Sequence, residues 1–273
     1  MKKALILAAA ALVLASCGVV PKGSDNKIGV VAHRGFWLSE AAMKSQNSIA
    51  SLTEAQKEGF WGSECDIHIT KDGQVVVNHN ADFVQKGLFI ASNDYSAFEG
   101  VKLPNGEGLP LFSSYLEQAK KQPKTFLVVE FKDQKDAERN EALVSEALKL
   151  IREAGMYDPS KLGFISFSWD ICCRIAKECP KFVNQYLAGP VSGIKSPDKV
   201  HEAGINGIDY EFHVLLAHPD WVKEAKNLGM GVNCWTVNAK DDIQKMIDLG
   251  VDNITTNYPL VARELLGGRE SVR

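Results

Sequence analysis

The sequence predicts an α/β fold in which eight parallel strands, each followed by a helix, close into a TIM (β/α)8 barrel. The chain has 273 residues, of which 45% are hydrophobic, and this suits one barrel domain. From residue 28 onward, short β-branched and aromatic runs alternate with helical patterns, as parallel strands joined by crossover helices require. Eight such units follow one another, which is the number that closes a barrel.

Each element of this barrel has a local signal. We predict strands at 28–32, 62–67, 126–131, 163–167, 182–187, 207–211, 231–236 and 253–255. The clearest helices cover 48–57, capped by Ser48, then 136–154, and 219–228, which opens with Pro219. Glycine stands where helices should stop, at Gly59, Gly155, Gly204, Gly229 and Gly250.

Residues 81–109 break this rhythm, because glycine, asparagine, aspartate and aromatic residues replace a helical stripe. We interpret them as a short insertion between the second strand and the second helix, lying over the mouth of the barrel. Phe89, Tyr95 and Phe98 are its candidates for lining a pocket, and packing is their alternative role.

Two carboxylates crowd the second strand. Side chains alternate faces along a strand, so Glu64 and Asp66 project from the same side. At about 4 Å their repulsion is about 4 kcal/mol for an effective dielectric of about 20, so the pair requires a cation or a shared proton. Calcium and magnesium prefer oxygen ligands and keep positions that a phosphate oxygen can take. The alternative is a structural ion pair with a basic neighbour.

Two histidines end β-branched runs, at the mouth where barrel enzymes hold catalytic groups. His33 follows 28–31 and His79 follows 75–77, and two imidazoles can divide acid and base work. Beside His33, Arg34 offers a planar fork for a phosphate group.

Further charged residues end other strands. Glu130 closes the strand at 126–131 with Lys132 on the same face, so a metal ligand and a phosphate counter-charge arrive together. Glu211 ends the strand at 207–211 and is an additional candidate for substrate binding. His68 shares a strand face with Asp66, but we expect it in a surface or loop role.

These residues lie within motifs that resemble the glycerophosphodiester phosphodiesterase family. The family pattern runs HRG, ENT, ExD, TxDG, HD, ExK and WTVN. The chain carries VAHRGFW at 31–37, GSECDIHITKDGQVVVNHN at 62–80, TFLVVEFK at 125–132, VNCWTVN at 232–238 and VDNITTNYP at 251–259. The resemblance implies metal ligation by Glu64, Asp66 and Glu130, acid–base catalysis by His33 and His79, phosphate contacts from Arg34 and Lys132, and a pocket wall from Trp235. A plain core position is the alternative for Trp235.

At three positions an amide replaces a carboxylate of the family pattern. The family's ENT begins here with Gln46, its HD ends with Asn80, and its closing TD ends with Asn257. None of the three is an implied ligand or catalytic histidine. The mouth nevertheless carries less negative charge than the family pattern implies, so we expect a lower affinity for the metal.

The start of the chain predicts an exported, lipid-anchored protein. Two lysines precede an apolar stretch over 4–14 that is too short to span a membrane, and the string LASC then ends at Cys17. An ordinary signal peptide is the alternative. Our division is a lipoprotein signal peptide at 1–17, lipidation of Cys17, a flexible tether at 18–27 and the barrel at 28–273. Such a protein faces the periplasm or the cell surface of a bacterial envelope.

Composition excludes other classes of protein. Lysine and arginine number 31 against 34 aspartate and glutamate, for a net charge of −3, so nucleic acid is not an expected partner. This balance gives no attraction to an anionic membrane, so membrane contact must come from the anchor at Cys17. The other five cysteines cannot all pair with one another, and no zinc spacing is present. Cys65 should face the helix layer.

The sequence therefore predicts an enzyme that hydrolyses glycerophosphodiesters to glycerol 3-phosphate and an alcohol with two histidines and one divalent cation, calcium or magnesium. Which histidine is the acid, and whether water or a neighbouring glycerol hydroxyl attacks, stays open. Two alternatives also stay open. One is a ligand-binding lipoprotein with a degenerate site, and the other is a phospholipase C/D-like barrel that acts on lipid headgroups.

Overall fold

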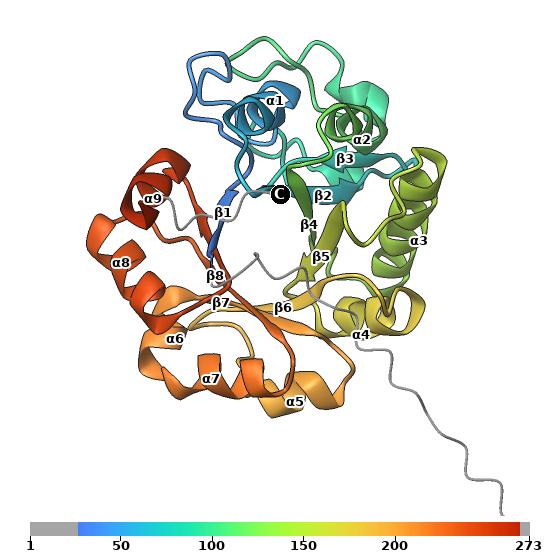
Figure 1. Cartoon of the computed structure of the whole chain (residues 1–273). Helices are drawn as coiled ribbons and strands as arrows, with labels where there is room; N and C mark the ends of the chain where they lie inside the picture. Colours follow the sequence, from blue (N-terminus) through green and yellow to red (C-terminus); the bar gives the residue numbers. More distant parts are fainter. Residues whose placement is uncertain (1–26, 268–273) are drawn as a thin grey trace, which may run out of the picture.

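Eight parallel strands form a closed ring in the computed structural model, which describes residues 27–267 (Figure 1). Each strand pairs in parallel with its neighbours, and the pairing of β1 with both β2 and β9 closes the ring. The strands are β1 (Gly29–Ala32), β2 (Gly62–Ile69), β4 (Phe126–Phe131), β5 (Leu162–Ser166), β6 (Asn184–Ala188), β7 (Gly207–Glu211), β8 (Gly231–Trp235) and β9 (Asn253–Thr256). The predicted TIM barrel is confirmed.

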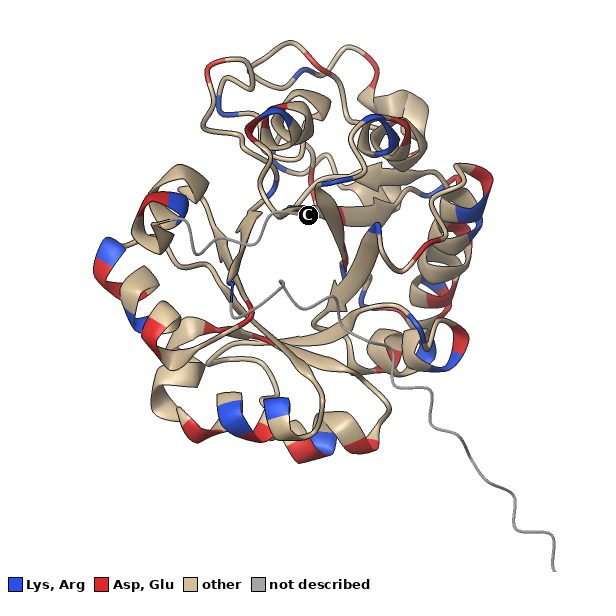
Figure 2. Cartoon of the chain, in the orientation of Figure 1, with Lys and Arg blue, Asp and Glu red and all other residues tan. Residues whose placement is uncertain are grey.

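Helices surround the ring and carry most of the charge that the described residues place on the outside (Figure 2). They are α1 (Ile49–Glu58), α2 (Phe112–Lys121), α3 (Ala137–Glu153), α4 (Trp169–Glu178), α5 (Pro197–Glu202), α6 (Phe212–Ala217), α7 (Asp220–Asn227), α8 (Lys240–Leu249) and α9 (Pro259–Leu266). As predicted, Ser48 caps α1, where its side chain accepts a hydrogen bond from the Ser51 N–H. Between residues 27 and 267, no helix combines the length and the apolar character needed to cross a membrane.

Two apolar layers hold the barrel together. Outward strand residues such as Cys65 and Val129 pack beneath the helices, so the predicted orientation of Cys65 is confirmed. Inside the ring, a separate cluster that includes Val31, Phe126 and Val183 fills the lower barrel. A Cβ atom on Gly163 would lie 2.7 Å from Val183 Cβ, so glycine leaves the room that this inner layer needs.

The short strand β3 (Val75–Val77), the β-branched run that precedes His79, was not among the predicted strands. It pairs antiparallel with the end of β2, outside the ring, with Val77 opposite Ile67. The turn between the two strands is far too short for the crossover that parallel strands require. His79 therefore returns to the mouth on a hairpin that the sequence analysis did not predict.

Residues 81–109 connect β3 to α2, include the short 3-10 helices η1 (Ile90–Ser92) and η2 (Tyr95–Phe98), and bury a small core of their own. Phe83 and Phe98 meet there edge to face, with ring centroids 6.1 Å apart. Figure 1 shows this segment beside α1 and α2, clear of the centre of the barrel. The expectation that residues 81–109 lie over the mouth of the barrel is therefore wrong.

The three aromatic candidates of the insertion have structural surroundings. Phe98 is buried in the small core, and the Tyr95 hydroxyl donates to the carbonyl of Leu109 at 2.8 Å. Phe89 is 49% exposed. None of the three lines the pocket described below. The expected signal peptide, and all of the expected tether except Lys27, lie outside the described residues.

Candidate active site

Three buried carboxylates meet at the mouth of the barrel. Glu64 and Asp66 lie on the inward face of β2, and Glu130 lies on β4 directly opposite Asp66. One oxygen from each residue lies within 4.8 Å of the other two. A cluster of carboxylate oxygens matches the ligand preference of a hard divalent cation.

Two cationic side chains border this acidic cluster. Lys132 Nζ lies 2.7 Å from Glu130 Oε1 and 3.3 Å from Asp66 Oδ1. Arg34 Nε lies 3.7 Å from Asp66 Oδ2, and the backbone N–H of Arg34 donates to Glu64 Oε2 at 2.7 Å. Glu64 Oε1 is buried and accepts no hydrogen bond from any residue that the structure describes. That unpaired oxygen fits a ligand position for a cation.

The electrostatics of the cluster also favour a cation. Burial raises the pKa of Glu64 well above its usual value, and the charges of Asp66 and Glu130 raise it further. Burial and Asp66 likewise raise the pKa of Glu130 to about 8, with Lys132 offsetting part of the effect. Burial also opposes ionisation of Asp66, but Lys132, His79 and Arg34 together hold its pKa below the usual range. A bound divalent cation would displace the protons that Glu64 and Glu130 otherwise retain.

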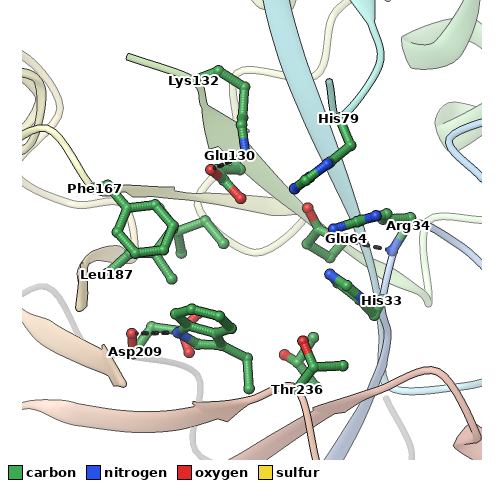
Figure 3. A pocket seen from close by; sticks show the side chains of 13 residues that line it. His33, Arg34, Glu64, His79, Glu130, Lys132, Phe167, Leu187, Asp209 and Thr236 are labelled. Carbon is green, nitrogen blue, oxygen red and sulfur yellow. Dashed lines mark hydrogen bonds and ion pairs between the residues drawn. The ribbon is translucent and has the colours of Figure 1, made fainter. Parts of the chain in front are cut away.

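Two imidazoles point into the space beside the cluster (Figure 3). His33 Nδ1 lies 2.8 Å from Asn257 Oδ1, and His79 Nδ1 lies 2.9 Å from Asn80 Oδ1. Trp37 Nε1 donates to the same Asn257 oxygen at 3.2 Å. Because an amide oxygen only accepts, Nδ1 of each ring carries the proton and Nε2 keeps its lone pair.

Burial disfavours the charged form of both imidazoles. Burial and the nearby charge of Arg34 lower the pKa of His33 to about 4, against a smaller opposing effect of its hydrogen bond to Asn257. Burial also lowers the pKa of His79, and the charge of Asp66 opposes this shift. Each ring is therefore able to accept a proton from a substrate or a water molecule.

Two members of the acidic cluster, Glu64 and Glu130, line a pocket of about 260 Å³ together with the two cationic side chains and the two imidazoles. The apolar residues of its lining are Ile165, Phe167, Leu187 and Trp235, and Figure 3 shows Phe167 and Leu187 across the pocket from the two histidines. Phe167 and Trp235 meet edge to face, with ring centroids 5.4 Å apart. The pocket thus combines charged residues suited to a phosphate group with apolar residues suited to its substituents.

The model of the glycerophosphoryl diester phosphodiesterase family matches residues 33–261, from His33 through the last barrel strand. The chain belongs to this family. As a member of the glycerophosphoryl diester phosphodiesterase family, it is a hydrolase that cleaves glycerophosphodiesters.

Relatives of this family match along most of their length. The chain is 26% identical over 254 residues to a probable glycerophosphodiester phosphodiesterase 1 of Mycobacterium tuberculosis, covering 84% of the chain and 89% of the relative. A crystal structure of a glycerophosphodiester phosphodiesterase from Parabacteroides distasonis is 38% identical, with a TM-score of 0.83, and covers 89% of this chain and 98% of that one. A phosphodiesterase structure from Oleispira antarctica, in complex with the product sn-glycerol-3-phosphate, is 18% identical with a TM-score of 0.76 and covers 89% of this chain and 98% of that one, which shows a shared fold.

The three amides that depart from the family pattern all contact site residues. Gln46 Oε1 accepts a hydrogen bond from Arg34 Nη1 at 2.7 Å, while Asn80 and Asn257 hold the two imidazoles. An amide oxygen accepts the same hydrogen bond as a carboxylate but adds no negative charge. The substitutions therefore keep the arrangement of the site and alter its electrostatics.

Asn47 is a site residue that sequence reasoning missed. Its side-chain N–H donates to Asp66 Oδ2 at 2.7 Å, and its Oδ1 accepts the backbone N–H of Asp66 at 3.1 Å. Its backbone has a positive φ of 59°, a conformation that asparagine tolerates better than most residues. Asn47 lies within the ENT motif, and its position there was the one available signal.

His68 was expected in a surface or loop role, and this expectation is wrong. The residue is 7% exposed, and its Nε2 lies 3.3 Å from the carbonyl oxygen of His79. Gln134 Nε2 lies 3.3 Å from His68 Nδ1 on the opposite side of the ring. His68 therefore supports the backbone that carries His79. Its position on the same strand face as Asp66 was the sequence signal for a place near the site.

Glu211 does not line the pocket. Its carboxylate instead accepts hydrogen bonds from the backbone N–H and the ring Nδ1 of His213. Asp209, two residues earlier on the same face of β7, lines the pocket in its place. It is buried, and burial raises its pKa to about 7 against an opposing hydrogen bond with Asn233. The sequence analysis chose the correct face of β7 but named Glu211 as the candidate instead of Asp209.

Proposed function

We propose that the chain hydrolyses glycerophosphodiesters to glycerol 3-phosphate and an alcohol, with one calcium or magnesium ion held by Glu64, Asp66 and Glu130. One observation carries the proposal: Glu64 and Glu130, two of the three clustered buried carboxylates, line the same pocket as both imidazoles and both cationic side chains. The Oleispira antarctica structure with sn-glycerol-3-phosphate supports the product.

The residues present fit a divalent cation. Glu64 offers an unpaired buried oxygen, and its carboxylate shares a small volume with two others. When bound, the cation would supply positive charge to the phosphoryl oxygens as the transition state forms. Arg34 and Lys132 lie on the same side of the pocket and would add charge-assisted hydrogen bonds to those oxygens.

The two histidines would divide the proton transfers. One neutral ring takes the proton from the attacking oxygen as that oxygen bonds to phosphorus. The other ring, protonated beside the anionic phosphate, gives its proton to the alcohol oxygen as the second P–O bond breaks. The attacking oxygen belongs to water or to the neighbouring glycerol hydroxyl, and both routes use the same two rings.

The test measures release of glycerol 3-phosphate from glycerophosphocholine, glycerophosphoethanolamine and glycerophosphoinositol with calcium, magnesium or a chelator. We expect release that depends on the cation, and a loss of roughly 100- to 10,000-fold in kcat for His33→Ala and His79→Ala. His201→Ala, at an exposed position on α5, is the matched control and should keep full activity.

Two other results would redirect the proposal. Folded protein that releases nothing with any cation would support the ligand-binding lipoprotein. Turnover of intact phospholipids in preference to the three water-soluble diesters would support the phospholipase.

We also propose that the chain is exported and anchored through lipid on Cys17, on the face of a bacterial envelope that lies outside the cytoplasm. The support is the LASC string that follows a short apolar stretch, which lies outside the described residues. Metabolic labelling with a radioactive fatty acid tests it. Labelling that persists in Cys17→Ser would contradict the proposal.

A further inference from the structure

The insertion, residues 81–109, contributes no residue to the pocket, but the side chain of Glu107 binds the N-terminus of α1. Glu107 Oε2 accepts the backbone N–H of Ile49 at 2.7 Å, and Glu107 Oε1 accepts that of Ala50 at 3.0 Å. These are the first two residues of α1, whose N–H groups have no partner within the helix. Asn105 Nδ2 also donates to Glu107 Oε1 at 2.8 Å and fixes the carboxylate from behind.

The residues just before α1 are held from the same side. The backbone N–H of Asn105 donates to Ser45 Oγ at 3.0 Å, and the Ser48 hydroxyl donates to the carbonyl of Ser45 at 2.8 Å. Ser45, Asn47 and Ser48 are all buried. The segment 45–49 is therefore fixed at both ends by contacts that begin in the insertion.

This segment also carries the two residues that hold the charged groups of the site. Asn47 binds both the carboxylate and the backbone N–H of Asp66, and Gln46 binds Arg34. The left-handed backbone of Asn47 costs free energy unless its surroundings impose it. If the start of α1 moved, Asn47 would move with it, and Asp66 would lose its orienting partner.

We propose that Glu107 is a positioning residue for the cation site: it fixes the start of α1, and through Asn47 it orients the carboxylate of Asp66. The insertion thus helps to position residues of the catalytic centre although it lies outside the pocket. This inference rests on the proposed function, because Asp66 is one of the three proposed ligands.

The first test is calorimetric titration of the full chain with calcium chloride or magnesium chloride alone. Loss of a residue that orients a metal ligand typically costs about 10- to 100-fold in affinity, so we expect Glu107→Ala to raise the dissociation constant at least about tenfold. Glu107→Gln keeps one acceptor oxygen and should lie between Glu107→Ala and the natural chain.

The matched control is Asp252→Ala. Like Glu107, Asp252 accepts a backbone N–H, that of Val232 at 2.9 Å, and it forms an ion pair with Lys226. It precedes β9 and so lies at the opposite end of the barrel. We expect this variant to lower Tm as Glu107→Ala does, but to leave cation affinity unchanged.

A second readout does not depend on the cation. The Asp66 amide donates to Asn47 Oδ1, so its hydrogen exchange should become faster in Glu107→Ala and Glu107→Gln, and stay unchanged in Asp252→Ala. Unchanged exchange in both Glu107 variants would overturn the inference, as would wild-type cation affinity in Glu107→Ala. A natural chain that binds neither cation would instead overturn the proposed function, whatever the exchange data show.

Discussion

At the scale of single residues, the amide partners of the two histidines are the most informative departure from the family pattern. Asn257 and Asn80 orient the rings of His33 and His79 through Nδ1. A carboxylate in the same place would also stabilise the positive form of the ring. With an amide there, burial and Arg34 set the pKa of His33, at about 4.

We therefore predict that Asn257→Asp raises the pKa of His33 by about one to three units, because an opposite charge at hydrogen-bond distance favours the imidazolium. NMR titration of the ring nitrogens in the cation-free chain measures the change. Asn227→Asp adds the same charge at an exposed position of α7 and should not shift it. A titration midpoint that stays in place in Asn257→Asp would contradict this account of the site.

Asp209 gives a second prediction at this scale. Burial raises its pKa from 3.8 to about 7, so the folded chain keeps a proton that the unfolded chain releases near pH 4. The free energy of unfolding should therefore fall as pH rises from about 4 to about 7 and level off above that. Roughly three pKa units correspond to a loss on the order of 4 kcal/mol.

We expect Asp209→Asn, which mimics the protonated acid, to be more stable than the natural chain at pH 8, with the difference shrinking toward pH 5. Urea unfolding at the two pH values measures it. Asp248→Asn removes the same charge from an exposed position of α8 and should give equal differences at both. If Asp209→Asn also gave equal differences, ionisation of Asp209 would not be the cause.

At the scale of elements, strand positions were predictable because each buried strand alternates between two apolar environments. The strands at Phe126–Phe131 and Gly207–Glu211 have the predicted bounds, and the others differ by one or two residues at one or both ends. β3 was missed as a strand, since three valines give too short a pattern for assignment. The tight turn before it was the available signal for an antiparallel hairpin.

That hairpin explains how His79 reaches the site. β2 continues past Asp66 to Ile69, β3 runs back along it, and the Asn78 N–H donates to the carbonyl of Asp66 at 2.9 Å. His79 thus returns to the level of Asp66. The period-two pattern predicted a shared strand face for Glu64 and Asp66 and another for Glu130 and Lys132, and the family resemblance grouped the three carboxylates. Contacts between distant segments, such as that of Glu107 with α1, produce no periodic pattern in the sequence. They could be identified only in the folded structure.

At the scale of the whole molecule, the proposed cation would connect neighbouring strands of the ring. Two proposed ligands lie on β2 and one on β4, so the complete site exists only when these two strands are paired in the folded chain. A cation that binds the folded chain and not the unfolded chain stabilises the fold by mass action, by about 2.7 kcal/mol at 100 times its dissociation constant.

We predict that calcium or magnesium at that excess raises Tm by several degrees, since about 1 kcal/mol shifts the Tm of a chain of this size by roughly 2–4 °C. Differential scanning calorimetry measures the shift, a chelator should reverse it, and potassium chloride at equal ionic strength should not reproduce it. Glu130→Gln removes a ligand charge and should remove most of the shift. If that variant kept the full shift, the cation would be stabilising the barrel from elsewhere, and the acidic cluster would lose its assignment as the metal site.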